Sequence, residues 1–304
     1  MNSDLTLCGW RVRTELPLPE LLEWSGDHRD PDLFVTRVPA TAIDRESAPI
    51  RPLGLLTRIG ESGTWILDIP TVGTLQVSGG KHIQVSVRDS SSDDHIRAFV
   101  LGPALAVCCS QKNLVPLSGS VVSRGSRAIA LLGNRGVGKS AVALALSRFG
   151  YGLVSDGITV LRESSHEPRF EALATFPFHQ LWRRAVFSLN LPVEVMRKTR
   201  PCLEKYLWPC AAAFDPAVAT SLSDIVILRR ESDEDATTIS AEHSDPIMSH
   251  LMRSIACDHQ YKGGVSMSDL SGALRRLALS VRTHVVAMTE DDEVASLIDG
   301  LVTP

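Results

Sequence analysis

The first third of the chain alternates apolar and polar residues in short runs, a pattern typical of β-strands. Clusters of Gly, Pro, Asp and Ser separate these runs, as expected for turns. The predicted strands are residues 33–38, 64–69, 74–79 and 82–87. The stretch Ser-Gly-Gly-Lys at 78–81 is typical of a hairpin turn between the last two. We therefore expect a mainly β amino-terminal part.

A change of period follows. The polar run at 88–94 is rich in Ser and Asp, which suit the amino-terminal cap of a helix. Residues 95–113 then place apolar side chains at helical spacing. This segment predicts one helix that links the two parts of the chain. We expect a mainly β domain at 1–112, with this linking helix, and a second domain at 113–304.

The second part alternates strands with helices, as in layered α/β domains. Two strands around a turn are predicted within residues 121–133, a helix at 139–149, and short strands at 152–155 and 158–161. Further along come an apolar strand at 223–230, a helix at 270–281, a strand at 283–288 and a closing helix at 291–302. The charged segment 229–238 predicts a surface loop. The predicted fold class is α/β.

The composition and net charge of the chain limit the kinds of partner it is expected to bind. The chain has 304 residues, of which 44% are hydrophobic and 22% charged, with a net charge of −4. This balance indicates a globular protein and does not favour nucleic acid binding through a broad basic face. The longest apolar run, FVLGPALAVCC, has eleven residues and is too short to span a bilayer. No signal peptide is recognisable at the amino terminus.

The six cysteines show neither CxxC pairs nor zinc-site spacing with histidine. Adjacent Cys108 and Cys109 lie in an apolar run, where they are expected to be small buried side chains. These features predict a cytoplasmic protein that binds no nucleic acid, membrane or structural metal.

The stretch LLGNRGVGKS at 131–140 satisfies the phosphate-loop pattern G-x₄-G-K-[ST] between an apolar strand and a helix. A chance match in a Gly-rich turn is disfavoured by that context. Backbone N–H groups and the helix amino terminus would face phosphate oxygens, Lys139 would reach the β- and γ-phosphates, and Ser140 would bind Mg²⁺. ATP and Mg²⁺ are therefore the predicted cofactors. The predicted nucleotide-binding residues are Gly133, Asn134, Arg135, Gly136, Val137, Gly138, Lys139, Ser140 and Ala141.

Asp156 follows the loop after one helix and one turn. We expect it at the carboxyl end of the strand next to the loop strand, facing the γ-phosphate. There it could accept a proton from an attacking hydroxyl or help to hold Mg²⁺. The alternative is an aspartate of a helix-strand turn that satisfies backbone donors.

Cations could also stabilise transferred charge, because phosphoryl transfer depends mainly on electrostatics. Arg200 and Lys205 are the candidates, and a solvated pair of Glu204 with Lys205 is the alternative. His179 and Trp182 could line a substrate edge, although the start of a half-buried helix is favoured there.

Residues 117–162 resemble the catalytic domain of HPr kinase/phosphorylase, in which a strand hairpin, a phosphate loop and its helix precede a pair of aspartates. Three further stretches resemble the family: residues 9–21, 176–182 and 200–209. The closer resemblance is to shorter HPr-kinase-like proteins, some of them found in lasso-peptide gene clusters. The implied fold is a phosphate-loop kinase-like domain preceded by a smaller, mainly β domain.

By this resemblance, Lys139 would contact the transferring phosphate, Ser140 would bind Mg²⁺ and Asp156 would be the general base for a serine hydroxyl. Two positions depart from the family. Its histidine before the first hairpin strand falls at Ser118, and its second aspartate falls at Gly157. These departures put the family's reverse reaction, phosphorolysis, in doubt. The relatives include hexamers, so a homo-oligomer is a further expectation of unspecified size.

The leading hypothesis is an ATP-dependent kinase that phosphorylates a serine hydroxyl of a peptide or small protein. The amino-terminal part would recognise the substrate or mediate assembly. One alternative is a nucleotide-binding module without transfer activity, which Ser118 and Gly157 motivate. The other is a simple NTPase, disfavoured because no acid-ended strand follows at the usual distance.

Overall fold

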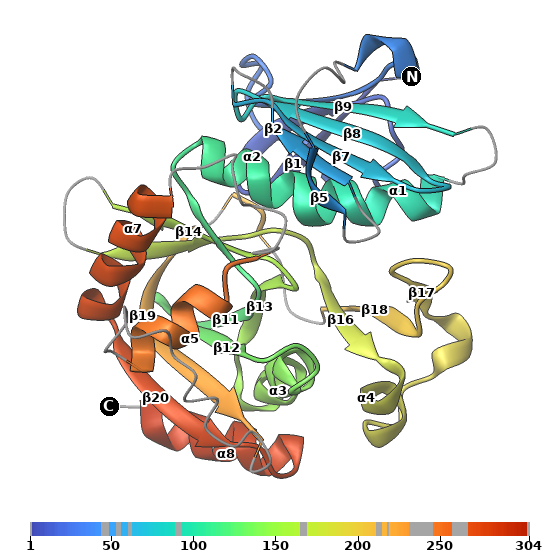
Figure 1. The fold of residues 1–304 in the computed structure, drawn as a ribbon. Coiled ribbons are helices and arrows are strands. Elements are labelled where there is room, and N and C mark those ends of the chain that lie inside the picture. The colour runs from blue at the N-terminus through green and yellow to red at the C-terminus, as the bar shows by residue number, and fades with distance from the viewer. Residues whose placement is uncertain are drawn as a thin grey trace.

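The computed structural model describes several stretches of the chain, and the fold is given for these alone. They are residues 2–43, 49–52, 56–59, 63–88, 93–164, 169–210, 215–217, 219–230, 246–256 and 267–302. Their strands form three sheets, and helices lie between and beside them (Figure 1). No helix of these stretches is both long and apolar enough to cross a membrane.

The amino-terminal sheet has nine strands in the order β3-β1-β2-β4-β9-β8-β7-β6-β5. They are β1 (Ser3–Leu7), β2 (Trp10–Thr14), β3 (Leu22–Glu23), β4 (Leu33–Arg37), β5 (Pro49–Pro52), β6 (Leu56–Ile59), β7 (Trp65–Ile69), β8 (Gly73–Ser78) and β9 (His82–Val87). The four predicted strands and the hairpin turn between β8 and β9 are confirmed. Strands β1 and β2 were not predicted, although half-buried Arg11 and Arg13 alternate with buried Val12 and Thr14.

The predicted linking helix is broken. It consists of α1 (Asp93–Phe99), a π-helical turn (Val100–Ala104) and α2 (Leu105–Gln111). Gly102 has non-helical backbone angles, φ −107° and ψ −108°, and Pro103 has no N–H to donate to the helix. The prediction of one continuous helix was therefore wrong. Its predicted cap at 88–94 falls mostly on residues 89–92, which lie outside the described residues.

The second sheet has eight strands in the order β10-β14-β15-β19-β12-β11-β13, with β20 also paired to β19. They are β10 (Val115–Leu117), β11 (Ser120–Arg124), β12 (Arg127–Gly133), β13 (Gly152–Asp156), β14 (Thr159–Glu163), β15 (Phe170–Leu173), β19 (Ala219–Arg229) and β20 (Arg282–Ala287). Strands β12, β19 and β20 run parallel, and the other pairs are antiparallel. The chain thus has an α/β fold with mixed sheets. Of the predicted surface loop, residues 231–238 lie outside the described residues.

Helices cover both faces of the central strands, which explains their nearly continuous apolar runs. On one face α3 (Lys139–Leu146) and α8 (Asp291–Val302) pack over Ile129, Leu131, Val226 and Leu228. On the other face α5 (Pro246–Arg253) and α7 (Met267–Ser280) belong to the cluster that contains Ala128, Ala130, Leu132, Ile225 and Ile227. The predicted closing helix and the helix of residues 270–281 are confirmed.

A small third sheet stands beside α3 (Figure 1). It pairs β16 (Phe178–Trp182) with β18 (Lys205–Pro209), and β18 with β17 (Arg197–Lys198). The short helix α4 (Arg183–Ser188) follows β16 directly. The predicted helix start at His179 was therefore wrong, because His179 is a buried residue within a strand and the helix begins after Trp182.

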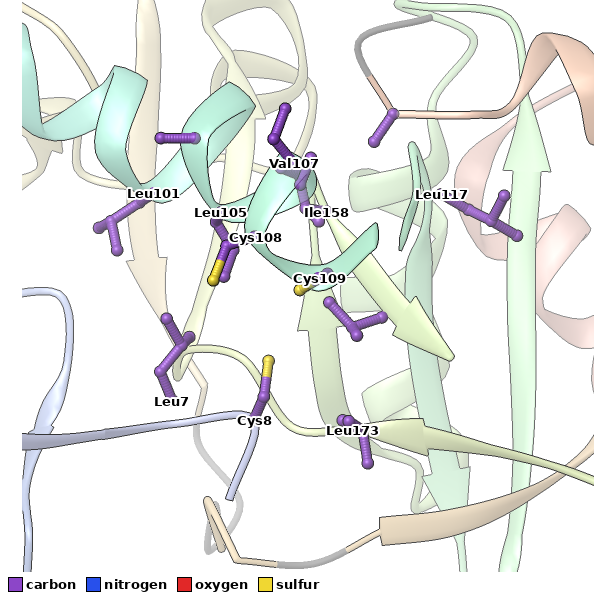
Figure 2. Packing of buried hydrophobic residues seen from close by; sticks show 14 of the residues in the cluster. Leu7, Cys8, Leu101, Leu105, Val107, Cys108, Cys109, Leu117, Ile158 and Leu173 are labelled. Atoms are coloured by element: carbon purple, nitrogen blue, oxygen red, sulfur yellow. The ribbon is translucent and has the colours of Figure 1, made fainter. Parts of the chain in front are cut away.

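One hydrophobic cluster runs from the amino-terminal sheet into the second sheet, with α2 between them. Figure 2 shows Cys8 and Leu173 below Cys109 of α2, and these residues belong to one cluster with Leu105 and Cys108. Backbone bonds add to this contact, since Cys8 N–H donates to Ala174 O at 2.9 Å. The expectation that Cys108 and Cys109 are small buried side chains is confirmed.

Candidate functional site

The loop between β12 and α3 has a shape that requires glycine. Gly133 and Gly138 have φ angles of +137° and +124°. A Cβ on Gly133 would lie 2.4 Å from Leu228 O, and one on Gly138 would lie 2.7 Å from the Met288 Cε atom. A side chain is therefore excluded at Gly133 by backbone, and at Gly138 it is disfavoured by the φ angle and would have to displace the end of the Met288 side chain. The loop leads directly into α3, whose amino-terminal N–H groups are available to an anion.

Lys139, the first residue of α3, folds back over this loop. Its Nζ donates to Gly133 O at 2.8 Å and to Asn134 O at 3.1 Å. Burial lowers the pKa of Lys139 to about 8, although the nearby Asp156 carboxylate opposes the shift. The ammonium therefore lies against the loop, in a partly desolvated position.

Asp156 ends β13 and is 1% exposed. Its Oδ1 accepts hydrogen bonds from Ser120 Oγ at 2.5 Å, Ser140 Oγ at 2.9 Å and its neighbour's N–H, that of Gly157, at 2.8 Å. Its Oδ2 accepts one from Gln180 N–H at 2.5 Å. The carboxylate is thus fixed beside the first turn of α3. Three donors share Oδ1, whereas Oδ2 has one donor for its two lone pairs, so Oδ2 keeps one acceptor site.

The predicted position of Asp156 in the sheet needs correction. Strand β13 pairs with β11, and β11 separates it from the loop strand β12. Asp156 still reaches Ser140, because the helix α3 passes over β11 and β13 as well as β12. The alternative of a turn aspartate that serves only backbone donors is also insufficient, since two of its donors are serine hydroxyls.

Gly157 is the position where the resembling family has a second aspartate, and the backbone there disfavours one. Its φ angle is +81°, in the left-handed region. A Cβ would lie 2.7 Å from Gln180 Nε2 and 3.1 Å from Gln180 Oε1. The Gln180 amide therefore fills the space into which a side chain at position 157 would begin.

Gln180 joins the charged residues of the site. Besides its backbone bond to Asp156 Oδ2, its Nε2 donates to Asp156 O at 3.2 Å. Its Oε1 accepts a hydrogen bond from Lys205 Nζ at 2.8 Å. Sequence reasoning missed Gln180 and Ser120. The polar Ser120 within an apolar strand was a weak signal, whereas nothing in FPFHQLW distinguished Gln180.

Lys205 of β18 is half-buried and lines the cavity. Burial lowers the pKa of its ammonium, and the Asp156 carboxylate opposes that shift. The alternative of a solvated pair with Glu204 was wrong, because Glu204 instead binds Lys198 and accepts a bond from Tyr206 Oη at 2.6 Å. The structure thus brings Lys139, Asp156 and Lys205 together.

Arg200 is not brought to this cluster. Its guanidinium carbon lies 5.0 Å from the centroid of the Phe99 ring, and it does not line the cavity described below. His179 is 2% exposed, and burial lowers its pKa, which favours the neutral ring. Trp182 lines the cavity and is 36% exposed. The backbone N–H of Ser118 donates to Ser254 O at 2.5 Å.

The phosphate-loop residues and the charged cluster of Lys139, Asp156 and Lys205 line one cavity of about 1170 Å³. All nine predicted loop residues line it, together with Asp156, Gln180 and Lys205. Residues 288–290, which connect β20 to α8, line one side together with Asp291 and Asp292 of α8. Residues of α1 and the π-helical turn line another side. The arrangement combines an anion-binding loop, two ammonium groups and one fixed carboxylate in a single space.

No protein-family model matches the chain, and no curated protein matches it. Among solved structures, it is similar to the HPr(Ser) kinase/phosphatase from Coxiella burnetii. The match has 12% sequence identity and a TM-score of 0.33, and covers 62% of this chain and 87% of the other. The similarity is distant, so the residue roles below are argued from the geometry of this chain.

Proposed function

We propose that the chain is an ATP-dependent kinase that transfers the γ-phosphoryl group to a serine hydroxyl of a peptide or small protein. The observation that carries this proposal is the 2.9 Å hydrogen bond from Ser140 Oγ to Asp156 Oδ1. It places a carboxylate directly beside the phosphate-binding loop, with two lysines in the same cavity. Residues 113–304 would form a phosphate-loop kinase-like domain.

The residues fit a nucleotide and Mg²⁺. The loop has glycines with positive φ at positions 133, 136 and 138, so no side chain there covers the backbone N–H groups that can approach phosphate oxygens. Ser140 Oγ donates a hydrogen bond to Asp156 Oδ1, which leaves the lone pairs of Ser140 Oγ for a cation. In phosphoryl-transfer sites Mg²⁺ is bound by one or two protein groups plus phosphates and waters. ATP–Mg²⁺ would supply the transferable phosphoryl group.

Each residue then has a defined task. Lys139 and Lys205 would neutralise negative charge on the transferring group from two sides, one from the loop and one from β18. The free capacity of Asp156 Oδ2 would orient the acceptor hydroxyl and take its proton as the new O–P bond forms and the bond to the leaving oxygen breaks. Gln180 would hold Lys205 and Asp156 in place.

Incubation of the protein with γ-labelled ATP, Mg²⁺ and serine peptides tests this proposal. Label in a peptide supports the kinase. Release of free phosphate alone would instead support an NTPase, and nucleotide binding with neither product a binding module without transfer. One specific observation favours the binding module without transfer: Asp156 Oδ1 already accepts three hydrogen bonds.

The Asp156→Asn variant should lower the transfer rate by about 10²–10⁴-fold, as expected for loss of acid–base catalysis. Nucleotide binding, measured by calorimetry, should persist. The matched control is Asp30→Asn, an exposed aspartate of the amino-terminal part that does not line the cavity. Transfer at an unchanged rate in Asp156→Asn would contradict the proposed role of Asp156.

A further inference from the structure

The cavity is larger than the phosphate-binding loop requires. Its volume of about 1170 Å³ exceeds the roughly 300–1,000 Å³ of typical small-molecule sites. It extends from the loop to α1 and the π-helical turn, which come from the amino-terminal part (Figure 1). This second wall is distant in sequence from all predicted loop residues, and the proposed nucleotide site gives it no task.

The wall formed by the amino-terminal helices is chiefly apolar. It contains residues from α1 and the π-helical turn, from the turn between β13 and β14, from the segment between β15 and β16 and from the segment after α5. These are Ala98, Leu101, Gly102, Ile158, Phe176, Ile255 and Ala256. Gly102 has no atom within 4 Å of the position of a Cβ, so the wall is open at the break between α1 and α2.

The charged side chains on this wall have ion-pair or hydrogen-bond partners. Arg97 is 6% exposed, and its Nη2 lies 3.0 Å from Glu20 Oε1. Arg97 also binds Asp94, and Arg253 Nη2 donates to Ser249 Oγ at 2.9 Å. The other oxygen of Glu20, Oε2, is buried and has no hydrogen-bond partner among the described residues. Buried acceptors of this kind are usually satisfied, so a ligand N–H would relieve its cost.

The geometry of phosphoryl transfer restricts the side from which the acceptor hydroxyl can approach the nucleotide. The attacking and leaving oxygens of a phosphoryl transfer lie roughly in line. With the nucleotide phosphates on the loop, the acceptor hydroxyl must therefore approach the γ-phosphate on the side opposite the leaving oxygen. The apolar wall lines the same cavity as the loop and contains no loop residue, so it can hold a peptide that carries this hydroxyl.

We propose that the wall of Ala98, Leu101, Gly102, Ile158 and Ile255 is the acceptor subsite, and that it takes a serine flanked by small, uncharged, apolar residues. This inference rests on the proposed function. Charged flanking residues are disfavoured because they would lose hydration without finding an unpaired partner. Glu20 Oε2 would accept a main-chain N–H of the peptide, since two arginines, Arg97 and Arg197, already offset its charge.

The first test uses the unaltered protein and peptides that differ only beside the serine. Fluorescent peptides with Ala, Val or Leu at the flanking positions should bind at least tenfold more tightly than those with Asp or Lys there. Binding is measured by anisotropy with a non-hydrolysable ATP analogue and Mg²⁺, so it does not depend on transfer. Equal or tighter binding of the charged peptides would overturn the subsite.

The second test fills the subsite. Ala98→Leu adds volume at a half-buried helix position on the wall and should raise the KM for the apolar peptide at least tenfold, with ATP affinity unchanged. The control is Ala273→Leu, half-buried on α7 and outside the lining. An unchanged KM in a folded Ala98→Leu protein would refute the subsite. Selective binding of apolar peptides without any transfer would instead support the subsite and contradict the kinase.

Discussion

At the scale of single residues, Gln180 has the largest consequence for the charge of the site. Its neutral amide accepts from Lys205 Nζ and donates to Asp156 O, so Lys205 is held without a counter-charge of its own. A carboxylate at the same place would pair with Lys205 and repel Asp156. The amide therefore keeps the ammonium available to the transferring phosphate.

Gln180→Glu should reduce the transfer rate at least tenfold and affect nucleotide KM less. Burial lowers the pKa of Lys205, and the new carboxylate would raise it. The other groups around Lys205 would be unchanged by the substitution; they are Arg135, Lys139, Asp156 and the Trp182 ring. The pH profile of kcat should consequently move to higher pH. The control is Gln76→Glu on β8, where Gln76 Nε2 donates to Gln84 Oε1 far from the cavity. A profile and rate like those of the unaltered protein would contradict the assigned role.

Gly157→Asp, which would place an aspartate where the HPr kinase/phosphorylase family has its second one, should not improve activity. The left-handed backbone costs on the order of 1–3 kcal/mol for such a side chain, and Gln180 must move as well. Chemical denaturation measures the loss of stability. Gly125→Asp is the matched control, because Gly125 has φ +61° and open space around its Cβ position. A Gly157→Asp loss no larger than that of the control would show that Gln180 yields freely.

Nucleotide affinity should fall as pH rises above about 8. Burial lowers the pKa of Lys139 to about 8, so the free protein loses this proton at higher pH, whereas bound phosphate requires the ammonium. The decline should approach tenfold per pH unit for one proton. Lys139→Arg stays charged at all these pH values, so its residual affinity should lack this decline. A flat profile in the unaltered protein would contradict the buried position of Lys139.

Sequence reasoning identified the loop residues and Asp156 because they are adjacent in sequence to a strand and helix of recognisable pattern. It could not assign Gln180, since its role depends on a strand pairing, β16 with β18, and on a backbone N–H that carries no residue identity. Lys205 was found only as one of two cations, because sequence does not reveal which side chain points inward.

At the scale of elements, local pattern predicted where strands and helices lie but not which strands are neighbours. Asp156 was expected on the strand beside β12, yet β11 intervenes. Strand β12 pairs with β11 on one side and with β19 on the other, which leaves β13 at the edge beyond β11. The linking helix was expected to be continuous, and the Gly102-Pro103 pair within it was the available signal for the break.

Helix α2, the second half of the predicted linking helix, contributes buried residues to the cluster that both large sheets share. Leu105 of α2 is 1% exposed and lies between the two sheets (Figure 2). Leu105→Ala should lower the free energy of unfolding by about 2–5 kcal/mol, because it removes buried area and leaves a cavity. Urea denaturation measures this change. Leu279→Ala is the control, since Leu279 is 84% exposed and should cost little; equal losses would argue against the packing of α2.

At the scale of the whole molecule, the two large sheets share one hydrophobic cluster. Residues 113–304 expressed alone should therefore fail to show a cooperative unfolding transition, because Leu117, Ile158 and Leu173 would lose their cover from α2 and the amino-terminal sheet. Calorimetry or circular dichroism on heating tests this. A cooperative transition in the fragment would show that the second part folds by itself.

The buried thiols of this contact make its opening measurable. Burial raises the pKa of Cys108 to about 12 and that of Cys109 well above its ordinary value, so both are inert to alkylation while covered. Cys8, in the turn between β1 and β2, points toward Cys109 (Figure 2). Cys202 is exposed and gives an internal reference for reagent access. Pulsed labelling, read residue by residue by mass spectrometry, would therefore report the free energy of separating the two sheets in the native protein. If an acceptor peptide bridges both parts, its binding would slow the labelling of these three cysteines and leave that of Cys202 unchanged.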